Sequence, residues 1–266
     1  MNQPNHPALG DLPVALTIAG SDSGAGAGIQ ADLLTFAANG VYGTTALTCL
    51  TAQNPRGVSG VLAATPAFVT EQCRQVAVHY RPKALKTGML LDAGIVAAVA
   101  GFIAESKIPA VIDPVMVASS GATLLSAEAL KSVQTQLLPL AAVATPNLDE
   151  ASILLGRRAA GGPRCAEEAA ELANLYGVPF LLKGGHAVGD DLIDVLAWPD
   201  GRTLVLTAKR IPHIDTHGSG CTLSAAIAAQ LAHGKPLEEA VRIAHAYLQK
   251  GMANPLQVSG LKHIRH

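Results

Sequence analysis

The chain has 266 residues, of which 49% are hydrophobic, 15% charged and 3% aromatic, and its formal net charge is −1. This composition provides a substantial apolar core, which argues against disorder and suits one large α/β domain. The balanced charge, the lack of a basic cluster and the few aromatic residues argue against nucleic acid as the main partner.

Short apolar runs alternate with helix-length amphipathic segments almost throughout the chain. The patterns predict strands at 14–19, 44–51, 58–63, 84–86, 110–112, 141–144, 180–183, 192–198 and 203–209. They predict helices at 29–39, 66–79, 92–105, 126–138, 148–155, 165–176, 220–233 and 236–252. Such alternation is typical of a mainly parallel sheet covered by helices on both faces. We expect residues 1–13 to form a flexible tail and residues 14–266 a single domain.

Polar motifs directly follow many of the predicted strands. They are Gly20-Ser21-Asp22, Lys86-Thr87-Gly88, Asp113-Pro114, Thr145-Pro146-Asn147 and Lys183-Gly184-Gly185. Because ligands of open α/β sheets bind beyond the carboxyl ends of the strands, these motifs predict one shared site at that edge.

The run from Asp215 to Cys221 is followed at once by an Ala-rich predicted helix. Gly218 and Gly220 flank Ser219, so the backbone can bend and point consecutive N–H groups at one place. Together with the helix dipole this favours an anion site, most often for phosphate, and predicts a lowered pKa for the Cys221 thiol. The alternative is a glycine-rich turn that only begins a core helix. His217 beside this loop is either a base or, as we favour, a hydrogen-bonded loop residue.

Two other nucleotide-binding motifs fit poorly. The segment 26–31 matches G-x-G-x-x-A, but no acidic residue for a ribose occurs between Asp32 and Glu71, which disfavours a dinucleotide fold. No G-x-x-x-x-G-K-[ST] motif occurs anywhere in the chain. Nucleotide phosphates would therefore bind at the loop that ends in Cys221.

Several charged and amide residues near strand ends carry two interpretations each. Asn147 and Glu150 are spaced as a capping box, or as oxygen ligands for Mg²⁺ together with Asp113. Lys183 follows a purely apolar strand and therefore needs a partner, for which phosphate oxygens would serve. Asp32 and Gln53 are either a solvated helix acid and a turn glutamine, or residues of the site.

The four cysteines show neither a C-x-x-C pair nor a metal-ligand spacing. The N-terminal segment lacks the pattern of a signal peptide, and the apolar windows are too short to span a bilayer. We therefore expect a reduced, cytoplasmic protein with no membrane partner.

Taken in order, the motifs resemble those of the hydroxymethylpyrimidine/phosphomethylpyrimidine kinases of thiamine biosynthesis, which are ribokinase-like. The resembling segments are 17–24, 26–33, 50–54, 86–90, 113–117, 145–148, 182–186 and the loop ending in Cys221. The resemblance covers about residues 14–253 and implies a ribokinase-like three-layer α/β/α fold. It also implies two successive phosphorylations by ATP with Mg²⁺, of 4-amino-5-hydroxymethyl-2-methylpyrimidine and then of its monophosphate, and a homodimer.

The resemblance also implies roles for individual residues. The pyrimidine would be bound by Gly20, Asp32, Gln53, Met89 and Val115, with Asp32 and Gln53 on its polar edge. Amides of Gly218, Ser219, Gly220 and Cys221 would form the anion hole, and Cys221 would stand where most ribokinase-like kinases carry an aspartate base. ATP would be bound by Asn147 and Lys183, and Mg²⁺ by Glu150 and Asp113.

The chain departs from the family pattern at Ser119, where many relatives carry a lysine, and at Ala25, which replaces a frequent glycine. The stretch 211–216 also looks about two residues short, which leaves Asp215 and Thr216 loosely placed. A pyridoxal or pyridoxine kinase is the nearest alternative function, and a non-catalytic pyrimidine sensor is another.

Overall fold

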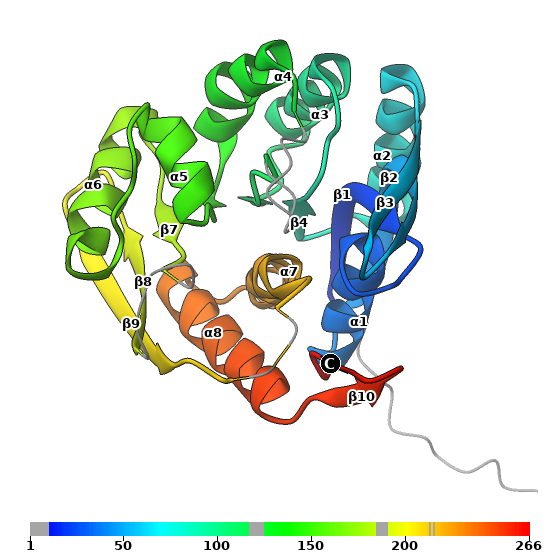
Figure 1. The fold of residues 1–266 in the computed structure, drawn as a ribbon. Helices are drawn as coiled ribbons and strands as arrows, with labels where there is room; N and C mark the ends of the chain where they lie inside the picture. The colour runs from blue at the N-terminus through cyan, green and yellow to red at the C-terminus, as the bar shows by residue number, and fades with distance from the viewer. Residues whose placement is uncertain (1–10, 117–124, 185–190, 213, 215) are drawn as a thin grey trace, which may run out of the picture.

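The computed structural model describes residues 11–116, 125–184, 191–212, 214 and 216–266 (Figure 1). Nine strands in these residues form one sheet in the order β3-β2-β1-β4-β5-β6-β7-β8-β9. They are β1 (Val14–Asp22), β2 (Tyr42–Asn54), β3 (Gly57–Ala63), β4 (Ala84–Thr87), β5 (Ala110–Ile112), β6 (Val143–Ala144), β7 (Phe180–Leu182), β8 (Asp191–Ala197) and β9 (Thr203–Lys209).

The central part of the sheet is parallel. β1 pairs in parallel with β2 and β4, and the parallel pairing continues through β5 and β6 to β7. β3 at one edge, and the hairpin β8–β9 at the other, run antiparallel to their neighbours. The predicted mainly parallel sheet with a terminal hairpin is therefore confirmed.

Helices cover both faces of the sheet, so the molecule has three layers, as Figure 1 shows. One face carries α1 (Gly28–Ala38), α7 (Ser219–Ala232) and α8 (Leu237–Ala253). The other carries α2 (Pro66–Tyr80), α3 (Ala93–Ser106), α4 (Ala127–Ser132), α5 (Leu148–Leu155) and α6 (Cys165–Tyr176). None of the helices within the described ranges has the length and apolar character of a bilayer span.

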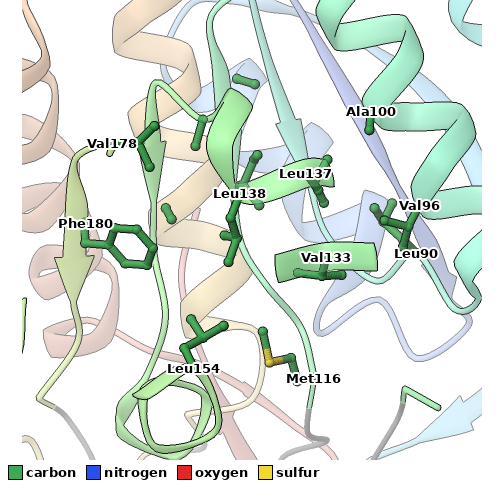
Figure 2. Packing of buried hydrophobic residues seen from close by; sticks show 14 of the residues in the cluster. Leu90, Val96, Ala100, Met116, Val133, Leu137, Leu138, Leu154, Val178 and Phe180 are labelled. Atoms are coloured by element: carbon green, nitrogen blue, oxygen red, sulfur yellow. The ribbon is translucent and has the colours of Figure 1, made fainter. Parts of the chain in front are cut away.

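Each face of the sheet has its own hydrophobic cluster, because successive strand residues point to opposite sides. Leu85 and Ile112 pack under the α2–α6 layer, whereas their neighbours Ala84 and Val111 pack under α1, α7 and α8. Figure 2 shows part of the first cluster, in which Phe180 of β7 lies among leucines from several elements. Both faces of the parallel strands are thus sealed, and their carboxyl ends are left for the site.

The predicted helix at 126–138 is wrong in its second half. α4 begins with Ser126 as N-cap but ends at Ser132, and a π-helical turn, Val133–Leu137, and a 3₁₀ turn, Leu138–Leu140, follow. The wider π turn lets Leu137 and Leu138 both enter the core, where they are 1% and 0% exposed (Figure 2). Pro139 has no N–H to donate and so cannot continue the helix.

A second, two-stranded sheet near the C-terminus, which was not predicted, is formed by β10 (Leu256–Val258) and β11 (Leu261–His263). Its turn residues, Ser259 and Gly260, have φ of 51° and 84°. Positive φ at both central positions is the hairpin geometry that serine-glycine pairs can adopt. Ile264 beyond it is buried in the cluster under α8.

Candidate active site

The site is formed where the N-terminus of α7 meets the glycine-rich loop after β1. Gly218 is the N-cap residue of α7 and has φ +79°, a conformation that favours glycine. A Cβ atom on Gly218 would collide with the carbonyl oxygen of Gly26. The two loops therefore touch backbone to backbone, and only glycine fits at this contact.

The start of α7 supplies backbone donors. Thr222 N–H donates to Gly218 O over 2.8 Å, which is the first helical bond, while the N–H groups of Gly220 and Cys221 make no bond within the described part of the chain. Ser219 N–H, by contrast, donates to Thr216 O over 3.0 Å. The expectation that Ser219 contributes a free amide is therefore corrected, because its N–H closes the turn before the helix. The Gly218 N–H likewise has no partner among the described residues, so three of the four predicted amides remain around the helix N-terminus, which is a suitable site for an anion.

Lys183 lies directly above this helix start. Its Nζ is 3.1 Å from Asp113 Oδ1, and a Cβ atom on Gly220 would be 3.1 Å from the same Nζ. Asp113 also accepts from Thr145 Oγ1 at 3.3 Å and from Ser224 Oγ at 3.4 Å. Burial alone would lower the pKa of Lys183, but the nearby carboxylates outweigh it and raise that pKa, so the ammonium stays charged.

Asn147 and Glu150 form a complete capping box at the N-terminus of α5. Asn147 Oδ1 accepts from Glu150 N–H, and Glu150 Oε2 accepts from Asn147 N–H, both at 2.9 Å. The structural interpretation of this pair is therefore confirmed. Burial, with a contribution from Asp113, raises the pKa of Glu150 to about 7, against the opposing charge of Lys183.

The residues present fit a magnesium ion held partly through water. The described residues contain no group of three or more histidine, cysteine, aspartate or glutamate side chains that could hold a metal by themselves. Asp113 nevertheless contacts Lys183, and burial raises the pKa of Glu150 although Lys183 and two backbone N–H groups favour its charged form, so these carboxyl groups suit a further cation. Mg²⁺ is commonly bound by one or two carboxylates together with waters and nucleotide phosphates.

The expected lowering of the Cys221 pKa is wrong. The side chain is half-buried, and burial raises the pKa of its thiol to about 11. Asp32 and Asp113 raise it further, whereas the charge of Lys86 and the Gly28 N–H oppose the increase. Loss of solvent contact and two nearby carboxylates therefore outweigh the helix dipole.

Asp32, which the resemblance assigns to the pyrimidine, is buried and paired in this structure. It is 0% exposed, both of its carboxylate oxygens lie within 2.8–2.9 Å of Lys86 Nζ, and Thr17 Oγ1 donates to it over 2.6 Å. Both of its oxygens already accept from protein groups, and contact of Asp32 with a pyrimidine stays a prediction. Lys86 is the partner that the sequence analysis missed. The signal was available, since a lysine within a buried strand needs a counter-charge just as Lys183 does.

Three other predicted substrate residues, Gly20, Met89 and Val115, lie near the carboxyl ends of β1, β4 and β5, and we call them the acceptor floor. A Cβ atom on Gly20 would lie 2.8 Å from Cys49 Sγ and 3.5 Å from Met89 Cε, so the absence of a side chain at Gly20 makes room for these two side chains. Met89 is half-buried, and its carbonyl oxygen accepts from Thr48 Oγ1 at 2.7 Å. Val115, also half-buried, follows Asp113 beyond β5.

Asp22 binds the two loops together. It accepts from Gly24 N–H at 2.8 Å and Ala27 N–H at 2.9 Å, and its Oδ2 lies 3.1 Å from His217 Nε2. Burial opposes ionisation, but these hydrogen bonds outweigh it and lower the pKa of Asp22. His217 is thus a hydrogen-bonded loop residue, as favoured. Ala25 in the same loop has φ +60°, which explains why glycine suits that position.

Ser119 and Asp215 lie outside the described residues. A surface cavity of about 360 Å³ exists elsewhere, lined by residues such as Ile103, Lys107 and Leu140. It lies at the amino ends of β5 and β6, so it is not part of this site.

A central parallel sheet between helical layers, with an anion site at a helix start beside a lysine, is the arrangement of a ribokinase-like kinase. A model of the phosphomethylpyrimidine kinase family matches residues 22–264. The hydroxymethylpyrimidine/phosphomethylpyrimidine kinase of Synechococcus elongatus is 47% identical over 248 residues, which cover 93% of this chain and 94% of that protein. The chain therefore belongs to the phosphomethylpyrimidine kinase family.

Solved structures agree with this assignment. An ADP complex of Bacillus subtilis pyridoxal kinase superposes with a TM-score of 0.87 at 35% identity, covering 96% of this chain and 98% of the other. The phosphomethylpyrimidine kinase of Clostridium difficile superposes with a TM-score of 0.78 at 36% identity, covering 89% and 98%.

Proposed function

We propose that this protein transfers a phosphoryl group from ATP to 4-amino-5-hydroxymethyl-2-methylpyrimidine, and then to its monophosphate, in cytoplasmic thiamine biosynthesis. One observation carries the proposal. In a chain of this family, the amides of Gly220 and Cys221, which have no partner among the described residues, lie beside the Lys183 ammonium at the carboxyl edge of the sheet.

Phosphoryl transfer depends mainly on positioning and on neutralising the charge of the transferred group. The two amides and Lys183 provide fixed positive charge where a γ-phosphate would be held, and they need not reorganise during the reaction. Asn147, which pairs with Lys183 through a parallel β-bridge, would bind the nucleotide from the next strand end.

Asp113 and Glu150 would hold Mg²⁺ at this place. The ion, when bound, would reduce the negative charge of the nucleotide phosphates. The positive charge of the ion would favour the ionised form of the Glu150 carboxylate. Lys183, already paired with Asp113, would remain in position for the phosphate.

The acceptor alcohol would lie on the floor formed by Gly20, Met89 and Val115, with Gln53 at its polar edge. With a thiol pKa of about 11, Cys221 is protonated at neutral pH. A protonated thiol cannot act as a general base, so we assign Cys221 to orienting the hydroxyl group.

The test is to incubate purified protein with Mg-ATP and each alcohol, and to identify products by mass spectrometry. We expect the pyrimidine monophosphate first and the diphosphate later, with Lys183→Met reducing kcat/KM by about 100-fold or more. Lys183→Arg, which keeps the charge, should retain more activity. Absence of the diphosphate would limit the function to the first step.

Pyridoxal kinase is the second candidate, since solved pyridoxal kinases superpose with TM-scores of up to 0.87. Faster phosphorylation of pyridoxal than of the pyrimidine in the same assay would select it. No product from either alcohol, with binding retained, would indicate a sensor.

We also propose a homodimer that uses the edge of the sheet at β3. Every residue of β3 is exposed, and Val58, Val61 and Leu62 are 49%, 48% and 68% exposed. Exposed apolar residues on an edge strand favour association with a second copy. Light scattering after gel filtration should give twice the chain mass, and Leu62→Asp should shift it towards the monomer. A monomeric wild-type protein would contradict this proposal.

A further inference from the structure

Three polar side chains from separate parts of the chain meet between the acceptor floor and the start of α7. Asp22 ends β1, Gln53 lies near the end of β2, and His217 directly precedes Gly218. His217 Nε2 is 3.1 Å from Asp22 Oδ2 and 3.3 Å from the Gln53 amide. One ring nitrogen thus contacts both a carboxylate and an amide.

The carboxylate decides where the proton is. Asp22 accepts two backbone N–H bonds, its side chain is 5% exposed and its pKa is lowered, so it is ionised and can only accept. His217 Nε2 must therefore carry hydrogen and donate to Asp22. The same nitrogen cannot accept a hydrogen bond from Gln53.

The amide of Gln53 must consequently present its oxygen to His217. With its nitrogen there, two donors would face each other at 3.3 Å. The contacts at the other end of the Gln53 amide independently indicate the same orientation. It lies 3.3 Å from Thr51 Oγ1, whose hydrogen is already donated to Ser21 O over 2.8 Å. Thr51 can then only accept, so this end of the amide must be nitrogen. The oxygen and nitrogen of an amide are assigned from such hydrogen bonds.

We propose that His217 is a positioning residue that, with Thr51, locks the Gln53 amide in one orientation and so sets the substrate preference of the site. The inference rests on the proposed function, in which Gln53 meets the polar edge of the acceptor. A locked amide offers one acceptor and one donor at fixed places. That pair matches a ring nitrogen next to an exocyclic amine, as glutamine matches adenine. Pyridoxal has no amine beside its ring nitrogen.

A double-mutant cycle tests this lock. The dissociation constant of the aminopyrimidine alcohol is measured by calorimetry without ATP, for wild type, His217→Ala, Gln53→Ala and the double variant. We expect His217→Ala to weaken binding by about three- to tenfold, the worth of one neutral hydrogen bond. In the Gln53→Ala background, His217→Ala should have no further effect. His217→Gln, which restores a donor, should recover affinity.

Several outcomes would overturn the inference. One is additive losses in the cycle; another is a large fall in kcat for His217→Ala with unchanged affinity, which would make His217 a base. Thr51→Val, nearly the same shape, removes the acceptor at the other end of the amide. It should weaken binding in the same direction, which keeps the test available if His217 variants fold poorly. If wild type binds pyridoxal but not the aminopyrimidine, the proposed function fails, and the same cycle with pyridoxal tests the lock.

Discussion

Removing either member of the buried Lys86–Asp32 pair should destabilise the protein, yet move the pKa of Cys221 in opposite directions. Both side chains are 0% exposed, and Nζ lies 2.8 Å and 2.9 Å from the two carboxylate oxygens. Loss of one partner leaves a buried charge uncompensated, which costs about 3–5 kcal/mol. Lys86→Met and Asp32→Asn should therefore lower the free energy of unfolding by similar amounts. The double variant should lose less than the sum.

The pKa of the Cys221 thiol distinguishes Lys86→Met from Asp32→Asn. The charge of Lys86 lowers the pKa of Cys221 and that of Asp32 raises it, around a value of about 11. Lys86→Met should therefore raise the thiol pKa, and Asp32→Asn should lower it. At pH 8 only about one thiol in a thousand is ionised at that pKa, and each unit changes the thiolate fraction tenfold.

Alkylation by iodoacetamide between pH 7 and 10 measures this fraction. Cys221 is half-buried whereas Cys49, Cys73 and Cys165 are buried, so Cys221 should react first, and Cys221→Ser gives the background rate. We expect slower alkylation in Lys86→Met and faster alkylation in Asp32→Asn. Equally faster alkylation in both variants would refute the electrostatic argument, because a general loosening of the structure would speed alkylation in both.

Two further predictions use matched controls. Gly218→Ala should abolish activity and lower stability strongly, because its Cβ atom would strike Gly26 O, whereas Gly234→Ala, also at φ +79° but in open space, should cost only about 1 kcal/mol. Similar losses in both variants would contradict the contact between the loops. The pKa of Glu150 in the folded protein, about 7, exceeds its ordinary value of 4.5. The contribution of Glu150 to the free energy of unfolding is therefore full below pH 4.5 and is lost as the pH rises through 7. Glu150→Gln should therefore resist urea better than wild type at pH 8, by up to about 3 kcal/mol, while losing Mg²⁺-dependent activity. Glu168→Gln, at a fully buried acid that accepts Ala160 and Gly161 N–H, should instead be destabilised at pH 8. Destabilisation of both variants at pH 8 would argue against a raised pKa.

Most elements were predictable because their signals are local. The limits of β5, α5 and α6 coincide with the predicted ranges, since short apolar runs, caps and glycines mark them. α4 was predicted too long because a helical pattern of apolar residues does not show that Leu137 and Leu138 both pack into the core, which requires a π turn.

The site was predictable in place but only partly in chemistry. Asp113, Lys183 and Gly220 meet at the carboxyl edge of the sheet, where the motifs after the strands predict a shared site. The pairing of Asp32 and the raised pKa of Cys221 were not predicted, because their environments come from α1, β1, β4 and α7, which are far apart in the chain.

The sequence alone determined the alternation of strands and helices, the edge of the sheet that carries the site, and the glycines that allow two loops to touch. These follow from periodicity and backbone conformation, which neighbouring residues dictate. The pairing of charges, by contrast, depends on how the chain folds: Lys86 pairs with Asp32, Lys183 pairs with Asp113, and Cys221 remains a thiol. Desolvation and Coulomb energies depend on distances in space, and packing sets those distances.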